Sequence, residues 1–369
     1  MWSNGLEYDD RVRKEIKSIR ALYPKIKISI FAIPGNNIAG KGITSYGVQY
    51  ELFPLKSRDL FRKGFLLIKV LEFYYKVRKK VSSYDLLWII DDQVFLFLLL
   101  SNKKKIWDLH EIPAGIIGSR LKNYLFKRMQ KRCSSVIHAN HERINYLNGL
   151  GLIETPKIHI VLRNYPDRDW LENVNLVSDE FIKFKKWINC KEFIYIQGVN
   201  SRNRYAIETL SSIIEAACIK AVVIGNVEIE VLQYLRIKYG KRLVEWIYFT
   251  GQLNQDKTAS FIFHSKFSMV FYSLNTPNNR FCEPNRMFQC LALSKPVIVG
   301  CNPTMKSVVE KYKVGIVQDS DGSDINEGIS SIKNMMYNYD EYFENIKKYH
   351  SLFSWEKQYD VLFNVIKSI

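Results

Sequence analysis

Side chains suited to binding an anionic sugar compound are concentrated in one short segment of the last third of the chain. It contains Glu283, Asn285, Arg286 and Gln289, and Pro284 predicts that a helix begins there, because the missing proline amide costs nothing in a first helical turn. Exposed N–H groups at a helix start, with an arginine beside them, form a phosphate site. Gln289, about one turn beyond Arg286, can bond a sugar hydroxyl. An ordinary capped helix that packs on a sheet is the alternative.

Other candidate residues come directly after short apolar runs that predict strands. They are Asp91 and Asp92, His110 and Glu111, Gly198 with Arg202 and Arg204, and Gly251. In open parallel sheets, ligands bind at the carboxyl ends of the strands, where loop amides and helix N-termini carry positive partial charge. We therefore expect these residues to lie at ligand sites.

Helical segments alternate with short apolar strands along the whole chain, which predicts α/β architecture with parallel sheets covered on both faces. The expected strands are 27–33, 84–90, 105–109, 135–139, 157–162, 193–197, 220–224, 243–249, 268–272, 296–299 and 314–318. The expected helices are 10–22, 58–80, 93–100, 119–132, 141–147, 205–217, 228–239, 256–264, 284–293 and a helical region from 324 onward.

The chain length and a looser stretch at 163–169 predict two domains. A chain of 369 residues is about twice the usual size of a single domain. We expect one doubly wound, Rossmann-like domain at 1–169 and a second at 170–345, facing each other across a cleft. A C-terminal helix at 346–369 is long enough to cross back onto the first domain.

Positive charge is concentrated in the first of these domains. The net charge is +17, and residues 1–169 carry 30 basic and 16 acidic side chains, against 24 and 21 in residues 170–369. A field of one sign favours an anionic partner, which is nucleic acid, an acidic membrane surface or a phosphorylated substrate. Composition alone does not choose among the three.

Hydropathy argues against a membrane-spanning protein, and cysteine spacing argues against a zinc-binding one. The longest apolar run, Val94–Leu100, is far shorter than the roughly 20 residues that cross a bilayer. No cleavable signal peptide precedes the charged start of the chain, so we expect a cytoplasmic protein. The six cysteines lie far apart and lack zinc-site spacing, which favours reduced core thiols and no metal centre.

Several segments resemble GT-B glycosyltransferases. Pro284–Gln289 and Lys295–Ile298 resemble the donor-site helix of family 4 of these enzymes, which carries a Pro-Asn-Lys-Leu-Phe-Glu-Tyr-Met-Ala-x-Gly-Lys-Pro-Val-Ile pattern. Ile194–Arg204 resembles the opening strand and glycine loop of their nucleotide-binding domain. In the first domain, Asp9–Glu15 and Trp107–Glu111 resemble their Asp-x-Arg-Val and Tyr-Asp-x-His-Glu segments.

The resemblance implies a retaining transfer of a sugar from a nucleotide-diphosphate sugar, with the acceptor on the first domain and the donor on the second. Cations stabilise the departing diphosphate without a metal ion, and no cofactor is needed. The residues implied are His110 and Glu111 for catalysis, Arg204 (or Arg202), Arg286 and Gly198 for the diphosphate, and Gln289, Glu283, Asn285 and Gly251 for the nucleotide.

The chain departs from the family 4 pattern in three ways. The second of two family glutamates is Gln289, and the first falls on Phe281, with Glu283 two positions late. Ser294 replaces the usual glycine. The strand that normally precedes the first helix has only residues 1–8 available, so we expect that strand to be absent or to lie upstream.

The segment 58–80 interleaves basic residues with aromatic and aliphatic ones. Such a helix can lie at an anionic bilayer. A basic acceptor domain fits a lipid-linked or lipopolysaccharide-type glycan acceptor, and a protein peripheral to the inner face of the cytoplasmic membrane in bacterial surface-polysaccharide assembly. A solvated charged face is the alternative for the same residues.

Four other functions remain open from the residues. Asp91 and Asp92 resemble the metal-binding aspartates of GT-A transferases, although adjacent carboxylates also cap a following helix. A non-catalytic sugar-nucleotide-binding protein and a sugar-nucleotide epimerase would use the same fold. A basic nucleic-acid-binding protein would explain the charge, but no RNP motif, zinc finger or recognition helix is present, so we expect no nucleic-acid partner.

Overall fold

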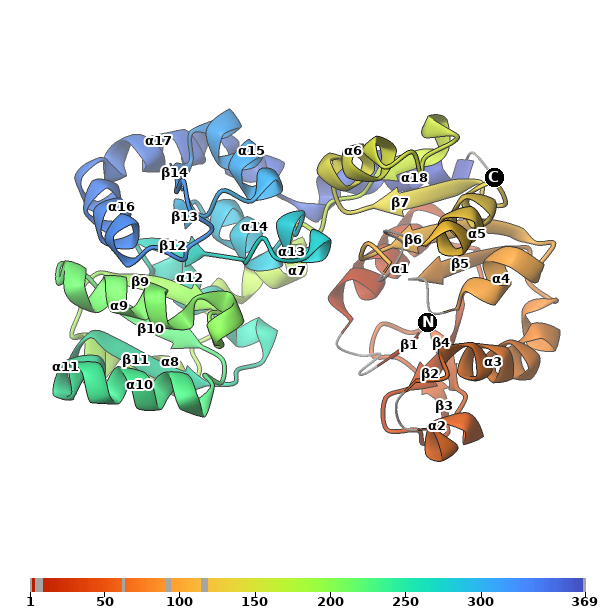
Figure 1. Ribbon diagram of the computed structural model, residues 1–369, viewed down its shortest axis with the longest axis horizontal. Helices are drawn as coiled ribbons and strands as arrows, with labels where there is room; N and C mark the ends of the chain where they lie inside the picture. Colours follow the sequence, from red (N-terminus) through yellow and green to blue (C-terminus); the bar gives the residue numbers. More distant parts are fainter. Residues whose placement is uncertain (1, 4–8, 62–63, 91–93, 114–118, 368–369) are drawn as a thin grey trace. The chain divides into compact units, whose positions relative to one another are not determined.

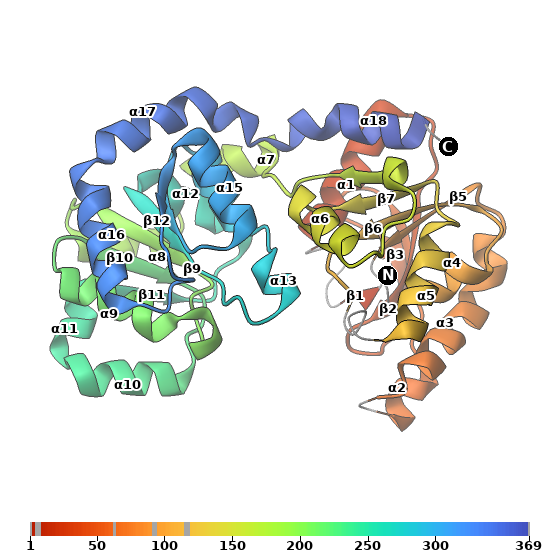
Figure 2. The same cartoon turned by 45° about the horizontal axis from the view of Figure 1, so that its top comes forward.

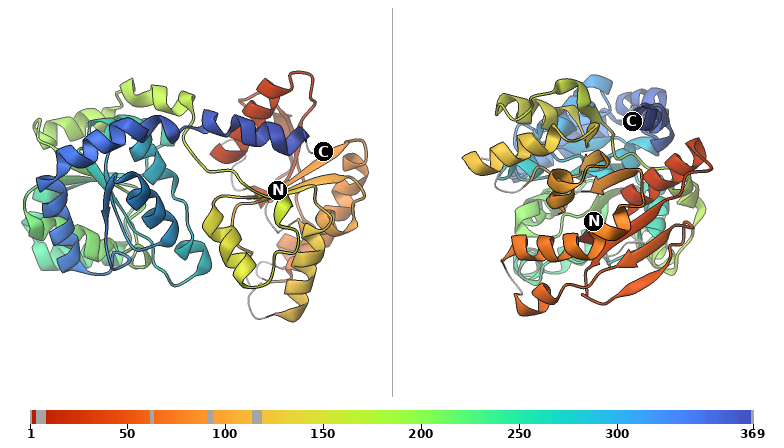
Figure 3. Two further views of the ribbon diagram at one scale, coloured as in Figure 1. Left: turned by 90° about the horizontal axis from the view of Figure 1, so that it is seen from above. Right: turned by 90° about the vertical axis from the view of Figure 1, so that its right-hand side faces the viewer.

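The computed structural model describes residues 2–3, 9–61, 64–90, 94–113 and 119–367 (Figure 1). The chain forms two compact units. The first unit comprises residues 1–163 together with 358–369, and the second comprises 164–357. The last helix, α18 (Tyr359–Lys367), lies beside α1 (Asp10–Leu22) in the first unit (Figure 3).

The first unit contains two four-stranded sheets among its described residues. One has the order β1-β2-β4-β3 and the other β5-β6-β7-β8. All neighbouring strands are parallel except β3 and β4, which are antiparallel. The strands are β1 (Trp2–Ser3), β2 (Ser29–Pro34), β3 (Gly40–Ile43), β4 (Gln49–Leu52), β5 (Leu86–Ile90), β6 (Lys104–Leu109), β7 (Ser135–His138) and β8 (His159–Val161).

Helices pack their apolar faces on these sheets. They are α1, α2 (Lys56–Leu60), α3 (Leu66–Val81), α4 (Phe95–Leu100), α5 (Arg120–Gln130), α6 (His141–Gly149) and α18. In α1, Val12 and Ile16 bury one face against β2 and its neighbours. A cavity of about 970 Å³ is bordered by consecutive residues of 25–31 and 83–90. Consecutive strand residues point to opposite faces, so it is the strand edges that border this cavity.

The second unit is built on one six-stranded parallel sheet with the order β11-β10-β9-β12-β13-β14. The strands are β9 (Phe193–Gln197), β10 (Lys220–Ile224), β11 (Ile247–Gly251), β12 (Phe267–Val270), β13 (Val297–Val299) and β14 (Gly315–Val317). The helices are α7 (Arg168–Leu171), α8 (Asp179–Ile188), α9 (Ala206–Ala216), α10 (Ile229–Tyr239), α11 (Lys241–Trp246), α12 (Thr258–His264), α13 (Pro277–Arg280), α14 (Asn285–Ala292), α15 (Pro303–Tyr312), α16 (Ile325–Tyr337) and α17 (Tyr339–Tyr349).

Two hydrophobic cores cover the opposite faces of this sheet. Tyr195 on β9 joins the core that contains α8 and α14 residues. Ile194 and Ile196, on the other side of the same strand, join the core formed with α9 and α16. This two-sided burial explains why β9 is continuously apolar in sequence, as strands of doubly covered parallel sheets are.

Four expectations about the elements need correction. The helix expected at 58–80 is broken into α2 and α3, because Gly64 and Phe65 have φ values of 80° and 50°, outside the right-handed helical region. Residues 243–246, expected to open a strand, belong to α11. The short β1 precedes α1 and pairs with β2, so a first strand is present. The antiparallel partner β3 was not expected.

The sequence also led us to expect buried cysteine thiols and no membrane-spanning segment. Cys133, Cys282 and Cys290 are buried free thiols, but Cys190 and Cys218 are free and exposed, so the expectation of core thiols is wrong for these two. In the described part of the chain, no helix combines the length and apolar character needed to cross a bilayer.

Candidate functional site

The candidate donor residues lie in the second unit, where the strand order of its sheet reverses. Successive crossovers run outward from β9 to β10 and β11 on one side, and through β12 to β13 and β14 on the other. A doubly wound sheet opens a crevice at the carboxyl ends of its strands at such a point. The loop after β9 begins with Gly198, and the segment after β12 leads into α14 and Arg286.

Gly198 and Arg286 are in close contact. A Cβ atom at position 198 would lie 2.3 Å from Nη1 of Arg286, and the φ of Gly198 is +71°, a conformation that disfavours residues with a side chain. Only glycine therefore lets the guanidinium group lie against the backbone at the end of β9. This contact brings together two residues that the sequence placed almost 90 positions apart.

A second arginine lies on the same aromatic ring. The Cζ of Arg204 is 4.0 Å from the centroid of the Tyr272 ring, and the Cζ of Arg286 is 4.7 Å from it. Among the described residues, neither arginine is in an ion pair, and Nε and Nη2 of Arg286 are buried without a hydrogen-bond partner. Two cations held close together without a carboxylate form an electrostatically unsatisfied site, which an anion would stabilise.

The expected nucleotide residues occupy α14 and the turn before it. Gln289 is only 3% exposed, and its Oε1 atom has no hydrogen-bond partner among the described residues. Buried amide oxygens are normally bonded, so this atom fits a hydroxyl donor from a ligand. Glu283 is also buried, whereas Asn285 is half-buried at the first position of α14.

The remaining expected residues of this unit differ in their surroundings. Gly251 ends β11 with a φ of +71°, and its carbonyl accepts from the N–H of Gly225 at 2.8 Å, so two glycines lie together at the ends of β10 and β11. The Arg202 side chain is exposed, while its backbone N–H donates to Glu228 at 3.2 Å. Arg204, not Arg202, is therefore the arginine that lies with Arg286.

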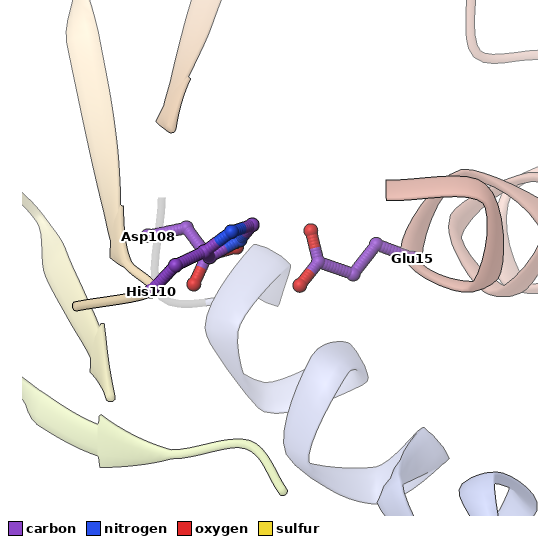
Figure 4. Close-up of side chains that lie close together, drawn as sticks. All are labelled: Glu15, Asp108 and His110. Atoms are coloured by element: carbon purple, nitrogen blue, oxygen red, sulfur yellow. The ribbon is translucent and has the colours of Figure 1, made fainter. Parts of the chain in front are cut away.

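In the first unit, the half-buried His110 belongs to a polar cluster with the buried Glu15 and Asp108 (Figure 4). His110 Nε2 lies 2.8 Å from Oδ2 of Asp108. The Nη2 group of Arg11 donates to Oδ1 of Asp108 at 2.9 Å, and its Nε lies 3.0 Å from Oε1 of Glu15. Arg11 also donates to the carbonyl of Leu162 at 3.0 Å.

The pKa values of the two carboxyl groups in this cluster are shifted in opposite directions. Burial raises the pKa of Glu15 well above its usual range, and the neighbouring Asp108 charge raises it further. Burial alone would also raise the pKa of Asp108, but Arg11 and His110 lower it below the usual range. At neutral pH Asp108 is therefore the charged group that orients His110.

Sequence reasoning found His110 but missed the residues that hold it. Arg11 and Glu15 are one helical turn apart on the same face of α1, and this spacing was a usable signal. Glu111 is exposed and lies outside the group of Glu15, Asp108 and His110.

The possible metal-ligand atoms of Glu15, Asp108 and His110 all lie within 4.8 Å of one another, as the ligands of a metal ion do. However, Arg11 donates to both oxygens of Asp108 and lies beside Glu15, so a guanidinium group already supplies the positive charge there. Asp91 and Asp92, the other metal candidates, lie outside the described residues.

Comparison with solved structures identifies the fold. Sucrose-phosphate synthase from Thermosynechococcus elongatus aligns with 97% of this chain and 92% of its own, at 13% identity and a TM-score of 0.72. An α,α-trehalose-6-phosphate synthase from Burkholderia multivorans aligns with 100% and 97%, at 9% identity and a TM-score of 0.71. The chain has the GT-B fold.

A third solved structure with this fold is HepE from Anabaena in complex with UDP. It aligns with 100% of this chain and 97% of its own, at 12% identity and a TM-score of 0.70. No protein-family model matches the chain, and no curated protein matches it in sequence. At these identities the structural similarity shows the fold and not the function.

Proposed function

We propose that this protein is a retaining glycosyltransferase that moves a sugar from a nucleotide-diphosphate sugar to a glycan acceptor. The observation that carries the proposal is the pair Arg204 and Arg286 on the Tyr272 ring, at the reversal point of a parallel sheet. A sugar nucleotide leaves as a diphosphate, so negative charge grows there in the transition state. Fixed cations aimed at that charge lower the barrier.

The buried groups around the arginines support a nucleotide in the same site. Oε1 of Gln289 can accept from a ribose hydroxyl, and glycine at position 198 lets the Arg286 guanidinium group lie at the end of β9, where it could bind the phosphates. The similar HepE structures were solved with UDP and with UDP-glucose. These observations favour a uridine nucleotide as the first donor to test.

The polar cluster of the first unit supplies a second part of the proposed chemistry. Asp108 fixes the His110 ring by the 2.8 Å bond to Nε2, and we assign His110 to contact the donor sugar. The leaving phosphate oxygen itself accepts the proton of the acceptor hydroxyl, so the new glycosidic bond forms on the face from which the diphosphate departs. Arg11 provides the cluster's positive charge, and we propose that the reaction needs no metal ion and no cofactor.

The acceptor is assigned to the first unit, as a membrane-presented, lipid-linked or lipopolysaccharide-type glycan. The excess of basic over acidic side chains in residues 1–169 supports an anionic acceptor. We further propose membership of the family 4 type of these enzymes, a role in bacterial surface-polysaccharide assembly, and a location at the inner face of the cytoplasmic membrane.

Release of UDP from UDP-glucose in the absence of acceptor tests the reaction. We expect slow hydrolysis that is unchanged by EDTA and falls about 100-fold in His110→Ala, because the transition state loses a hydrogen-bond partner at the donor sugar. The matched control is His350→Ala, which changes an exposed histidine of the second unit. Saturable binding of sugar nucleotides without any release, across a panel of UDP-, GDP- and TDP-sugars, would instead indicate a binding protein.

A further inference from the structure

The junction of α2 and α3 exposes an unusual group of large apolar side chains. We call Leu60, Phe65, Leu66, Leu67 and Ile68 the apolar tip. Their side chains are between 41% and 75% exposed, although they come from two adjacent stretches of chain. Single exposed apolar residues are normal on a protein surface, but a contiguous group marks an interaction site. Figure 2 shows α2 and α3 at the edge of the first unit.

The tip is held outward by local structure. Gly64 and Phe65 have positive φ values, which break the helix between α2 and α3. The rings of Phe61 and Phe65 lie 4.6 Å apart, so the two sides of the break are in contact. On the inner face of α3, Val70 and its neighbours Phe73 and Val77 fill the core. The core contact of α3 is therefore complete without the tip.

Basic residues continue the outer face of the same helix. Tyr75, Arg78 and Lys79 are exposed at helical spacing from Ile68, and the Arg78 guanidinium lies 4.8 Å from the Tyr75 ring centroid. Residues 56–80 contain nine basic and two acidic side chains. The outer face of α3 is thus apolar at its N-terminal end and cationic at its C-terminal end.

We propose that the apolar tip inserts into the interface of an anionic lipid bilayer, with Arg78 and Lys79 at the phosphate headgroups. The combination of exposed aliphatic and aromatic groups with adjacent cations fits a lipid surface, since the apolar groups enter the acyl boundary while the cations stay hydrated. A single headgroup charge would not explain the apolar tip. This inference specifies the membrane contact of the proposed function but does not depend on the donor site.

Vesicle co-sedimentation of the full chain tests the apolar tip. We expect binding to vesicles of phosphatidylcholine with about a third phosphatidylglycerol, and at least a tenfold weaker partition for Leu66→Ser/Leu67→Ser. The control variant is Ile237→Ser, which changes an even more exposed aliphatic residue, on α10. Absence of vesicle binding by the unaltered chain, or equal loss in both variants, would overturn the proposal.

The cationic half is tested separately. Arg78→Glu/Lys79→Glu should weaken binding to the anionic vesicles at least tenfold, whereas Lys347→Glu/Lys348→Glu on α17 should not, although all four side chains are exposed. Raising the salt concentration to about 0.5 M should weaken the unaltered chain likewise. Equal binding to pure phosphatidylcholine would contradict the anionic partner. Binding of UDP, measured on the same variants, should not change, so failure of the donor-site account and failure of this proposal give different results.

Discussion

Asp108 is the residue on which the polar cluster of the first unit depends. It is fully buried, and it is bonded to both Arg11 and His110. A buried ion pair contributes little over an apolar pair of the same shape, but removing one partner leaves an uncompensated charge. The stability of this unit and the orientation of His110 therefore rest on one carboxylate.

Asp108→Asn should lower the free energy of unfolding by about 3–5 kcal/mol, because the Arg11 guanidinium loses its buried counter-charge. Urea denaturation measures the change. Asp85→Asn, which changes an exposed aspartate of the same unit, is the matched control and should stay within about 0.5 kcal/mol of the unaltered protein. Similar stability of the two variants would contradict the buried ion pair between Arg11 and Asp108.

Gly198→Ala should weaken UDP binding about tenfold or more while leaving the second unit folded. The added Cβ would lie 2.3 Å from Arg286 Nη1, so the guanidinium has to move, and the positive φ adds strain of the order of 1–3 kcal/mol. Isothermal titration calorimetry measures the affinity. Gly149→Ala is the control, because no atom lies within 4 Å of the Cβ it would add. Unchanged affinity in Gly198→Ala would place the anion elsewhere.

At the scale of elements, a buried histidine of β7 and a half-buried histidine of β8 are in contact. His138 Nε2 lies 2.8 Å from His159 Nδ1, and the rings are stacked with centroids 5.1 Å apart. Burial lowers the pKa of His138 to about 3, with further lowering by His159, and burial lowers the pKa of His159 to about 4. Both side chains are therefore neutral in the folded protein at neutral pH.

These depressed pKa values predict how stability depends on pH. The unfolded chain binds protons at these two histidines near pH 6.5, but the folded chain does not until about pH 4 or below. The stability that the neutral pair contributes above pH 6.5 is therefore lost as the pH falls. We expect the unfolding free energy to decline between about pH 6.5 and 4, and less steeply in His159→Gln. Urea titrations across this range measure both slopes. Identical slopes would contradict the attribution of this pH dependence to the His138–His159 pair.

The elements predicted most accurately are those with one strong local pattern. β9, β10 and α1 span their predicted ranges. The runs 40–43 and 49–52 contain few apolar residues, so their sequence pattern does not predict strands. They become β3 and β4 because they form hydrogen-bonded pairs with each other and, for β4, with β2. At 243–246, Leu243 and Trp246 have helical spacing, which a four-residue window does not separate from a strand.

The candidate site was predicted only as far as its residues follow strands or match motifs. Arg286, Arg204 and Gly198 could be named from the sequence, but Tyr272, which lies against both arginines, could not. Its position depends on the crossover from β12 to α14. Asp108 and Arg11 were likewise absent from the predicted site, since their contact joins residues 97 positions apart.

At the scale of the whole molecule, the chain leaves the first unit after residue 163 and returns to it at 358. The expected division at 170 and the expected return at 346 had the same order, but α17 belongs to the second unit. The proposed anion site and the proposed membrane contact lie in different halves of the chain. The two arginines sit in the half with few excess cations, and the apolar tip and its cations in the half with many.

The central claim is that the second unit binds a nucleoside diphosphate through Arg204 and Arg286. The most direct measurement is thermal unfolding with UDP, GDP, TDP, ADP and CMP at about 100 times a typical dissociation constant, since binding to the native state alone stabilises by about 2.7 kcal/mol at that ratio. We predict a clear rise in Tm with one diphosphate, lost in Arg204→Ala and in Arg286→Ala but kept in Arg236→Ala, which changes an exposed arginine of α10. A Tm that no nucleotide raises, or a rise that survives Arg286→Ala, would contradict the account.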